Sequence, residues 1–307
     1  MNPVSSPIHV ILNTLAGTNS STETIRQRLV DLFTKQGMTP HIVLACRSRD
    51  ILDLTRRSVR QRSRMIVAGG GDGTLNAVAA GLVDTDVALG IVPLGTLNHF
   101  AKDVGIPLDL AGAVRTILEG RVVRVDVGDV NGRIFLNNSG LGLYPLIVRD
   151  RQKQQKRHGR GKWLAFVWAT FRTLRRYPFL RLDLCLNGTD IIRRRTPFVF
   201  VGNNVYQMDA LNIGSRLQLD AGTLSLYTTQ PVGRLGLLKL GVHLLTGQLH
   251  GQDDFSAFMA KDLVIKTRQR RLRVATDGEV TVLKTPLHYR IRPGTLPVIV
   301  PAETPVP

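Results

Sequence analysis

The chain of 307 residues has little cysteine, no long apolar run and few acidic side chains. Its two cysteines, Cys46 and Cys185, are too few for a disulfide framework, and no CxxC or Cys/His spacing indicates zinc. The longest aromatic and apolar run, WLAFVWATF at 163–171, is far short of the roughly 20 residues that span a bilayer. The first residues lack the pattern of a signal peptide. We therefore expect a protein of the reducing cytoplasm.

The shortage of acids leaves a large positive charge. Lys and Arg number 41 against 23 Asp and Glu, which gives a formal net charge of +18. Such a surface favours polyanions, whether nucleic acid, anionic lipid headgroups or nucleotides. The plain alternative is a protein that is simply basic, and composition does not choose between them. A hydrophobic content of 43% and this length suit a folded chain of two domains.

The first part of the chain, residues 1–122, alternates short apolar runs with amphipathic stretches. This order predicts an α/β domain of three layers, with a mostly parallel sheet covered on both faces. The expected strands are 8–13, 40–45, 64–69 and 88–95, and the expected helices are 21–37, 49–61 and 74–82.

The pattern changes near residue 122. Residues 123–300 contain short alternating runs separated by Gly, Asn and Pro, and Asn131-Gly132 is a strong hairpin signal. We expect an antiparallel β-sandwich here. Two helices are expected to interrupt it, at 161–176 and 233–247, and residues 301–307 should form a loose tail.

One stretch carries chemistry: MIVAGGGDGTLNAVAAGL, residues 65–82. A strand, a glycine-rich turn and a helix together suit phosphate, because freed N–H groups and the helix dipole favour an anion. The stretch matches neither GxxxxGK[ST] nor GxGxxG. A carboxylate at Asp72 suits a metal ion that accompanies phosphates, or a proton acceptor. The alternative is a plain glycine-rich turn with a helix-capping Asp.

These residues resemble a known family. GGDGTLNAV at 70–78 resembles the GGDGT signature of the diacylglycerol kinase catalytic domain family, which includes bacterial lipid kinases, sphingosine kinases and ceramide kinases. PLGTLNHFAKDVGIP at 93–107 is similar to its second block, and TDGE at 276–279 to its late DGE motif. VDVGDVNGRIFLNNSGLG and VGNNVYQM resemble blocks between them. The family is distantly similar to NAD kinases and 6-phosphofructokinases.

The resemblance implies an α/β domain followed by a β-sandwich domain, with ATP and Mg²⁺ in the cleft between them. The residues that would line the nucleotide phosphates are Asn13, Gly70, Gly71, Asp72, Gly73, Thr74, Asn76, Thr96 and Asn98.

The resemblance also implies the catalytic groups. In this family the base that accepts the hydroxyl proton lies in the DGE-like motif, so it would be Asp277 or Glu279. Asp72 would orient Mg²⁺ on the phosphates, or act as the base as it does in some relatives. Considered alone, TDGE also suits an ordinary hairpin turn.

The sequence departs from the family pattern in several places. Asn13 is followed by TLAG where the family has an NPxSG-like start, and His99 stands where Asp is common. The usual nucleotide-contacting Thr after the second strand is not evident, and Cys46 or Ser48 is offered instead. Some bacterial members hold a structural Mg²⁺ with an Asp directly before Gly; here LQLDAGTL moves that carboxylate to Asp220, so the site is rearranged or absent.

A basic segment at 149–176 indicates a surface for a partner. It holds ten Lys or Arg against one acid, Asp150. Aromatic and apolar side chains form one helical stripe within it. Such a segment suits an anionic membrane surface, or a core-facing helix after a solvated basic loop. We expect no nucleic-acid partner, because that interpretation depends on charge alone.

The sequence therefore predicts an ATP-dependent lipid kinase. It would phosphorylate the hydroxyl of a diacylglycerol-like or sphingoid-like lipid, in the cytoplasm and peripheral to the inner membrane surface. The alternatives are a kinase of a soluble acceptor, as NAD kinases are, and a catalytically weak protein that binds nucleotide or lipid. The acceptor and the oligomeric state are not encoded in any motif.

Overall fold

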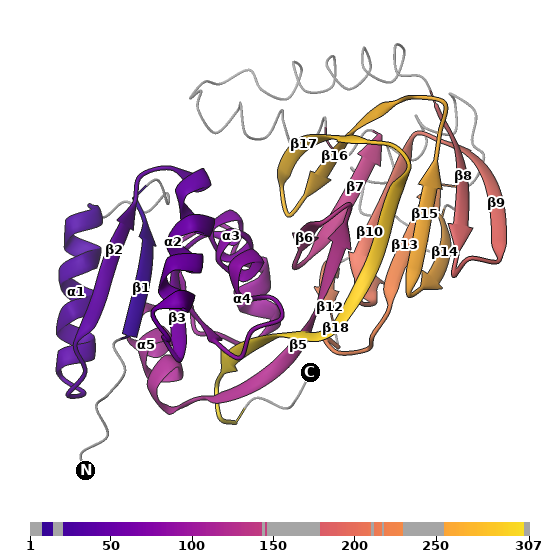
Figure 1. Cartoon of the computed structure of the whole chain (residues 1–307). Helices are drawn as coiled ribbons and strands as arrows, with labels where there is room; N and C mark the ends of the chain where they lie inside the picture. Colours follow the sequence, from indigo (N-terminus) through magenta and orange to yellow (C-terminus); the bar gives the residue numbers. More distant parts are fainter. Residues whose placement is uncertain are drawn as a thin grey trace, which may run out of the picture. The chain divides into compact units, whose positions relative to one another are not determined.

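The computed structural model describes residues 8–14, 21–142, 145, 179–209, 212–216, 218–229 and 255–303 (Figure 1). The chain divides into two compact units, which are described separately. Unit 1 contains residues 1–127, 218–221 and 292–307, and unit 2 contains residues 128–217 and 222–291. The helices predicted at 161–176 and 233–247, and the basic segment 149–176, lie outside the described residues.

Unit 1 is built on a parallel sheet with the order β2-β1-β3-β4. Its strands alternate with helices along the chain, as predicted. The strands are β1 (Ile8–Asn13), β2 (Pro40–Ala45), β3 (Met65–Gly70) and β4 (Ala88–Pro93). The helices are α1 (Thr22–Thr34), α2 (Ser48–Arg60), α3 (Asp72–Leu82), α4 (His99–Asp103) and α5 (Leu110–Glu119).

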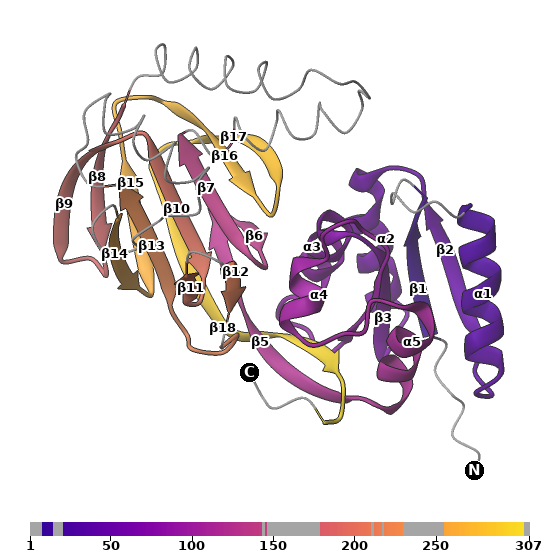
Figure 2. The same cartoon turned by 180° about the vertical axis from the view of Figure 1, so that it is seen from behind.

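Helices cover both faces of this sheet (Figures 1 and 2). Helices α1 and α5 share one core with β1, β3 and β4, while α2 packs on α3. The α2–α3 contact is close, because a Cβ at Gly81 would lie 2.6 Å from a methyl of Thr55. The predicted three-layer α/β domain is confirmed.

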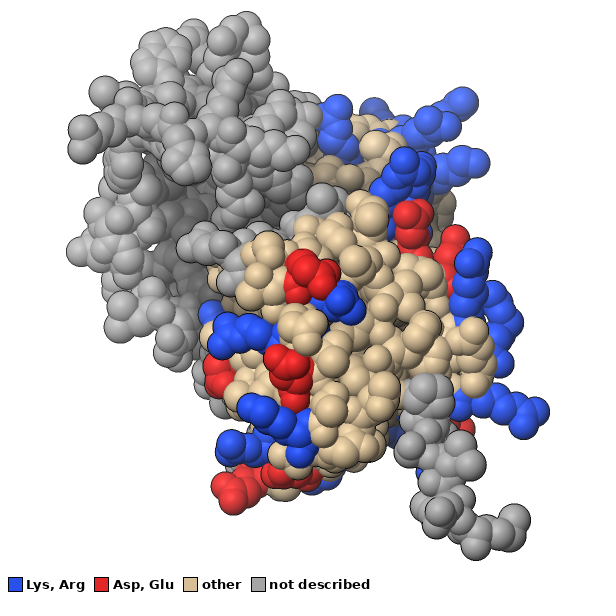
Figure 3. All heavy atoms as spheres, turned by 90° about the vertical axis from the view of Figure 1, so that its left-hand side faces the viewer, with Lys and Arg blue, Asp and Glu red and all other residues tan. Residues whose placement is uncertain are grey.

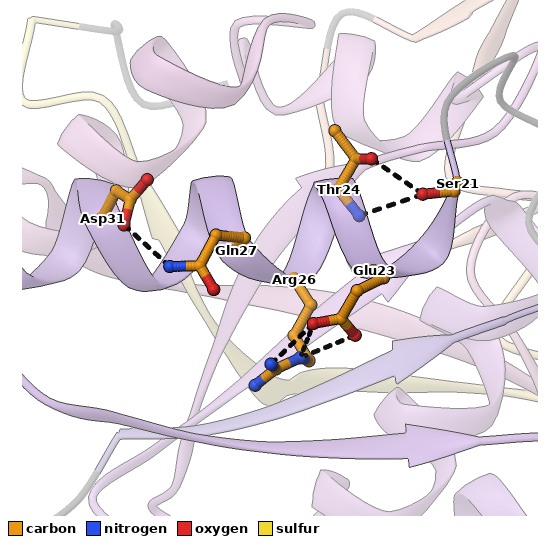
Figure 4. Close-up of polar contacts among 6 residues, drawn as sticks. All are labelled: Ser21, Glu23, Thr24, Arg26, Gln27 and Asp31. Atoms are coloured by element: carbon orange, nitrogen blue, oxygen red, sulfur yellow. Dashed lines mark hydrogen bonds and ion pairs between the residues drawn. The ribbon is translucent and has the colours of Figure 1, made fainter.

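Helix α1 shows why these segments are helical (Figure 4). The Ser21 hydroxyl caps it by accepting a hydrogen bond from the N–H of Thr24 at 3.1 Å. On the exposed side Glu23 and Arg26 form an ion pair at 2.7 Å, one turn apart. The opposite side is buried at Ile25, Leu29 and Phe33, which recur at the helical spacing.

Unit 2 is an antiparallel sandwich, as predicted. One sheet contains β15, β8 and β9 beside β18, and the other has the order β14-β13-β10-β7-β16-β17. Apolar side chains from both sheets form one buried cluster. The strands are β5 (Arg121–Val130), β6 (Arg133–Phe135), β7 (Asn138–Gly142), β8 (Leu180–Leu186), β9 (Asp190–Thr196), β10 (Phe198–Asn203), β11 (Tyr206–Asp209), β12 (Asn212–Arg216), β13 (Leu224–Thr229), β14 (Phe255–Ala260), β15 (Asp262–Lys266), β16 (Arg271–Thr276), β17 (Glu279–Lys284) and β18 (Leu287–Val300).

The turn at Asn131-Gly132 confirms the predicted hairpin. It joins β5 to β6, with Val130 paired to Arg133. Both turn residues have positive φ, 50° and 81°, which is the conformation that Asn-Gly favours in two-residue hairpins.

Two strands belong to both units. β5 leaves unit 1 after Val127, and β18 returns from unit 2 to unit 1 at Arg292. In unit 2 β18 pairs antiparallel with β15, whereas in unit 1 Val298 pairs parallel with Leu89 of β4. The sequence pattern places the domain boundary between residues 122 and 123 and assigns residues 123–300 to the second domain. In the structure, residues 292–307 belong to the compact unit 1.

Among the described residues, no helix combines the length and the apolar character needed to cross a bilayer. Figure 3 shows the side of the molecule that carries α1. On this face Lys and Arg stand mainly around the margin of the described surface, with smaller groups of Asp and Glu between them.

Candidate functional site

The glycine stretch lies at the end of a buried strand. β3 ends at Gly70, Gly71 precedes α3, and Asp72 is the first residue of the helix. The helix thus begins two residues before Thr74, where the sequence predicts its start. No side chain caps α3, and the first N–H groups of any helix lack intrahelical partners. Because residues 71–73 are partly exposed, these N–H groups and the positive end of the helix dipole are available to an anion.

The two family-like blocks of unit 1 meet backbone to backbone. A Cβ at Gly95 would lie 2.5 Å from the Cα of Gly71, and a Cβ at Gly71 would lie 3.1 Å from the Cα of Gly95. The N–H of Leu94 also donates to the carbonyl of Gly70 at 2.9 Å. These glycines therefore allow two loops of the protein to touch, in addition to any room they leave for a ligand.

The carboxylate of Asp72 joins α3 to α4. Its Oδ1 accepts a hydrogen bond from the N–H of Phe100 at 3.3 Å. This contact orients the Asp72 side chain across the start of both helices. A carboxylate held in this way can bind a cation through its other oxygen.

Two asparagines form hydrogen bonds that fix the start of α3 and the loop at Gly95. Asn13, at the end of β1, donates from Nδ2 to the Thr74 hydroxyl at 2.8 Å. Asn98 donates to the carbonyl of Gly95 at 2.7 Å and accepts from the N–H of the same residue at 3.0 Å. Asn98 also has a φ of 49°, a left-handed conformation that Asn tolerates. Asn98 therefore shapes the loop that contains Thr96.

The other predicted phosphate-lining residues differ in exposure. Asn76 is buried at 8% exposure on α3, whereas Thr96 and His99 are exposed. Thr74 is buried, and its side chain fills the space where Gly70 lacks a Cβ. Unit 1 thus brings together Asn13, Gly70, Gly71, Asp72, Gly73, Thr74, Asn76, Thr96 and Asn98.

The TDGE motif lies in unit 2 and is a two-residue hairpin turn. Asp277 and Gly278, with φ of 46° and 81°, connect β16 to β17, and Thr276 pairs with Glu279. The plain hairpin interpretation is therefore correct for the backbone. The Asp277 side chain does more than form a turn.

The carboxylate of Asp277 binds the segment between β6 and β7. Its Oδ2 accepts from the N–H of Leu136 at 2.7 Å, and its Oδ1 accepts from the N–H groups of Asn137 and Asn138 at 2.9 and 3.0 Å. The N–H of Asp277 donates in return to the carbonyl of Asn138 at 3.0 Å. Burial raises the pKa of Asp277 to about 6, and the three N–H donors and the charge of Arg216 oppose that rise.

A buried arginine holds the other side of the same segment. The Arg216 guanidinium donates to the carbonyl of Leu136 at 2.6 Å and to the side-chain oxygen of Asn137 at 2.9 Å. It also donates to the carbonyl of Asn203 at 3.2 Å, and the amide of Asn203 donates to the carbonyl of Leu136 at 2.8 Å. The backbone of Leu136 therefore donates its N–H to Asp277 and accepts from Arg216 at its carbonyl.

Sequence reasoning missed this network. Asn137 and Asn203 lie in the quoted blocks NNSGLG and VGNN, so the resemblance marked their segments without a role. Arg216 carried no sequence signal, because an arginine in a basic chain gives no indication that it is buried at 6% exposure.

The second candidate base has a partner of its own. Glu279 forms an ion pair with Arg133 at 2.8 Å, and the Nε of Arg133 donates to the hydroxyl of Thr276 at 3.0 Å. The side chain of Glu279 is 45% exposed. It is therefore partly open to solvent, and it fixes the arginine beside the turn.

Across the described ranges, no group of three or more His, Cys, Asp or Glu could hold a metal ion by protein side chains alone. Asp220, the predicted structural metal ligand, lies exposed in unit 1. Of the other predicted residues, Asp277 and Glu279 belong to unit 2 and the phosphate-lining set belongs to unit 1.

Comparison with known proteins covers nearly the whole chain. The Diacylglycerol kinase catalytic domain model matches residues 7–130, and the YegS C-terminal NAD kinase beta sandwich-like domain model matches residues 148–300. A Pseudomonas savastanoi pv. phaseolicola protein named "Probable lipid kinase YegS-like" is 30% identical over 297 residues, which is 95% of this chain and 93% of that protein.

Two further relatives agree. A Klebsiella pneumoniae protein of the same name is 36% identical over 130 residues, 41% of this chain and 44% of that protein. A crystal structure from Bacillus anthracis str. Sterne aligns with a TM-score of 0.75 and 25% identity, covering 96% of this chain and 97% of that one. The predicted two-domain fold and the phosphotransferase class are thereby confirmed. The chain belongs to the family of lipid kinases that carry the diacylglycerol kinase catalytic domain.

Proposed function

We propose that this protein transfers the γ-phosphate of ATP to the hydroxyl of a diacylglycerol-like or sphingoid-like lipid at the inner membrane surface. The observation that carries the proposal is the paired glycine loop of unit 1, where Gly71 and Gly95 touch and Asp72 opens α3. Such a loop offers N–H groups and a helix dipole to phosphate. Membership of the lipid kinase family supports the same chemistry.

The residues of unit 1 fit a magnesium nucleotide. Mg²⁺ usually takes one or two carboxylates and fills its other positions with substrate phosphates and water. Asp72 supplies one carboxylate, and its bond to Phe100 uses Oδ1 alone. Bound Mg²⁺ would neutralise charge on the transferring phosphoryl group. Asn13 and Asn98 position Thr74 and the Gly95 loop beside it.

We assign the proton acceptor to Asp277 and a supporting role to Glu279. Oδ2 of Asp277 has one backbone donor and Oδ1 has two, so Oδ2 retains a lone pair for the acceptor hydroxyl. A pKa raised to about 6 keeps the group ionised at neutral pH and makes it a stronger base than an ordinary aspartate. Glu279 is engaged by Arg133.

The test follows phosphate from γ-labelled ATP into the organic phase of a mixed-lipid extract. Wild type is compared with Asp72→Asn and Asp277→Asn, with Mg²⁺ present and chelated. Asp31→Asn, an exposed position on α1, is the matched control and should behave as wild type. We expect Mg²⁺-dependent label that both site variants reduce by about 10²-fold or more, and the labelled species names the acceptor.

The alternatives have distinct outcomes. Label that stays in the aqueous phase on a small molecule would indicate a soluble acceptor. Protection by ATP without transfer to any acceptor would indicate a nucleotide-binding protein. Either result would overturn the lipid-kinase proposal.

A further inference from the structure

A basic groove lies on the solvent side of the β8–β9 hairpin in unit 2. A hollow of about 750 Å³ is bounded by β8, β9 and the end of β15. It shares Thr267 and Arg268 with a neighbouring hollow of about 360 Å³. Of the described residues that line the two hollows, nine are Lys or Arg and one is an acid, Asp183. We refer to them together as the β8–β9 groove.

The strand register puts like charges opposite each other in this groove. Arg181 of β8 pairs directly with Arg195 of β9, and both side chains are exposed. Like charges in a directly opposed cross-strand pair destabilise a sheet. The structure therefore places a local electrostatic conflict on an exposed face, and such conflicts are found at functional sites.

The protein does little to neutralise this charge. Within the described part of the chain, the acid within ion-pair distance of the groove cations is Asp183, at 3.8 Å from Arg193. Arg195 lies over the ring of Phe179, with its guanidinium carbon 5.1 Å from the ring centre. Neither contact removes the repulsion between Arg181 and Arg195. An anion bound between them would.

The rim of the groove is held in place by hydrogen bonds. The loop at 267–270 joins β15 to β16, and the carbonyl of Gln269 accepts from the Thr285 hydroxyl at 2.6 Å. The carbonyl of Arg270 accepts from the Thr285 N–H at 3.2 Å. The backbone that presents Arg268 is thus fixed before a ligand binds, which reduces the entropy cost of binding.

The chemistry favours phosphate groups at a lipid surface. The planar fork of arginine donates to phosphate oxygens in pairs. Ile191 is 64% exposed and lies on the same face of β9 as Arg193 and Arg195, because side chains alternate along a strand. An exposed apolar side chain among cations suits a headgroup layer. Single-stranded nucleic acid binds on aromatic platforms, and no aromatic residue is found among the described residues that line either hollow.

We propose that the β8–β9 groove binds the phosphate headgroups of anionic phospholipids and docks unit 2 on the membrane. The choice of a lipid partner rests on the proposed lipid acceptor. The groove is built from residues other than those of the basic segment 149–176 and those of the phosphate-lining set.

The test measures binding to vesicles of phosphatidylcholine, alone or mixed with phosphatidylglycerol. The variant is Arg181→Gln with Arg195→Gln, and the control removes the same charge from exposed positions of unit 1 with Arg28→Gln and Arg56→Gln. One cation near an anionic surface contributes about fivefold to binding, so the groove variant should lose about 25-fold on mixed vesicles. The control variant should lose much less affinity for mixed vesicles. Neither variant should bind vesicles of phosphatidylcholine alone.

Two further readouts separate the possible failures. Removal of the opposed arginines relieves repulsion, so the groove variant should melt no lower than wild type, which excludes misfolding as a cause. Equal vesicle binding by the groove variant and the control would overturn the inference. Binding to single-stranded RNA is measured on the same proteins, and a groove variant that loses RNA binding but keeps vesicle binding would also overturn it. Kinase activity on a detergent-dispersed lipid is measured in parallel. Its absence from wild type would refute the proposed function and leave the vesicle result valid.

Discussion

The carboxylate of Asp277 is held by three hydrogen bonds. These bonds come from the backbone N–H groups of Leu136, Asn137 and Asn138, so an acceptor fits this position. Asp277→Asn would turn an amide donor toward the N–H of Leu136 or toward those of Asn137 and Asn138. A buried donor left facing a donor costs about 1–3 kcal/mol.

We therefore predict that Asp277→Asn lowers the free energy of unfolding by about 2 kcal/mol in addition to its loss of activity. Urea unfolding at neutral pH measures the change. Glu279→Gln is the matched control, because its half-exposed side chain keeps an acceptor oxygen for Arg133 and should alter stability little. Equal stability of the two variants would contradict the described geometry.

The pH profile tests the role of the same group. A base must be ionised, so protonation of Asp277 should lower kcat/KM as the pH falls through about 6, the value to which burial raises its pKa. Arg216 opposes that rise through its positive charge. Arg216→Gln should therefore move the acidic limb to higher pH.

Arg133→Gln is the control for this shift, since Arg133 pairs with Glu279 and should leave the limb in place. The measurement is kcat/KM between pH 5 and 8, a range chosen to bracket a pKa of about 6. An unmoved limb in Arg216→Gln would remove Arg216 from the network that tunes the base.

At the scale of elements, we expect nucleotide binding to depend on the close contact between the Gly71 and Gly95 loops. Gly95→Ala would place a Cβ 2.5 Å from the Cα of Gly71 and 2.7 Å from Oδ1 of Asn98, so the loops would have to separate. Gly71→Ala meets its neighbour at 3.1 Å and needs a smaller shift. Neither glycine has a positive φ, so backbone strain does not confuse the comparison.

We predict that Gly95→Ala weakens ATP binding by about tenfold, which corresponds to about 1.4 kcal/mol, and that Gly71→Ala weakens it less. Protection of the protein from thermal unfolding by ATP measures both. A larger loss of ATP binding in Gly71→Ala than in Gly95→Ala would mean that the glycines make room for the ligand rather than for the contact between the loops.

Periodicity and turn chemistry made most elements predictable. The strands 8–13 and 40–45 were predicted with the bounds that the structure has, and Asn131-Gly132 identified its hairpin, because these signals are local. The start of α3 was missed by two residues, since Asp72 and Gly73 read as part of a turn. The Gly71–Gly95 contact and the buried Arg216 depend on segments distant in sequence, which no local pattern encodes.

At the scale of the whole molecule, the return of β18 to unit 1 is the feature that composition could not show. The boundary near residue 122 follows from a change of pattern, but the sequence pattern assigns residues 292–300 to the second domain and 301–307 to a loose tail. Their membership of unit 1 depends on the pairing of Val298 with Leu89 and on a buried run from Leu296 to Val300.

We predict that Val298→Ala lowers the free energy of unfolding by about 1–3 kcal/mol, since its side chain is fully buried. It should also reduce protection by ATP, because it loosens the sheet that carries β3 and β4. Val282→Ala is the control: Val282 is 58% exposed on β17 and should change neither quantity. Chemical unfolding with and without ATP distinguishes the two positions.

The path of β18 also has a consequence for biosynthesis. The ribosome makes β1 to β4 first, yet the strand that pairs with β4 emerges only after all of unit 2. During translation the nascent sheet keeps an open edge at β4, and open edges invite pairing with other chains. We expect the nucleotide loops to reach their final rigidity last, although their codons are read early, so a chain stalled before residue 292 should be rich in helix and strand but unable to hold ATP.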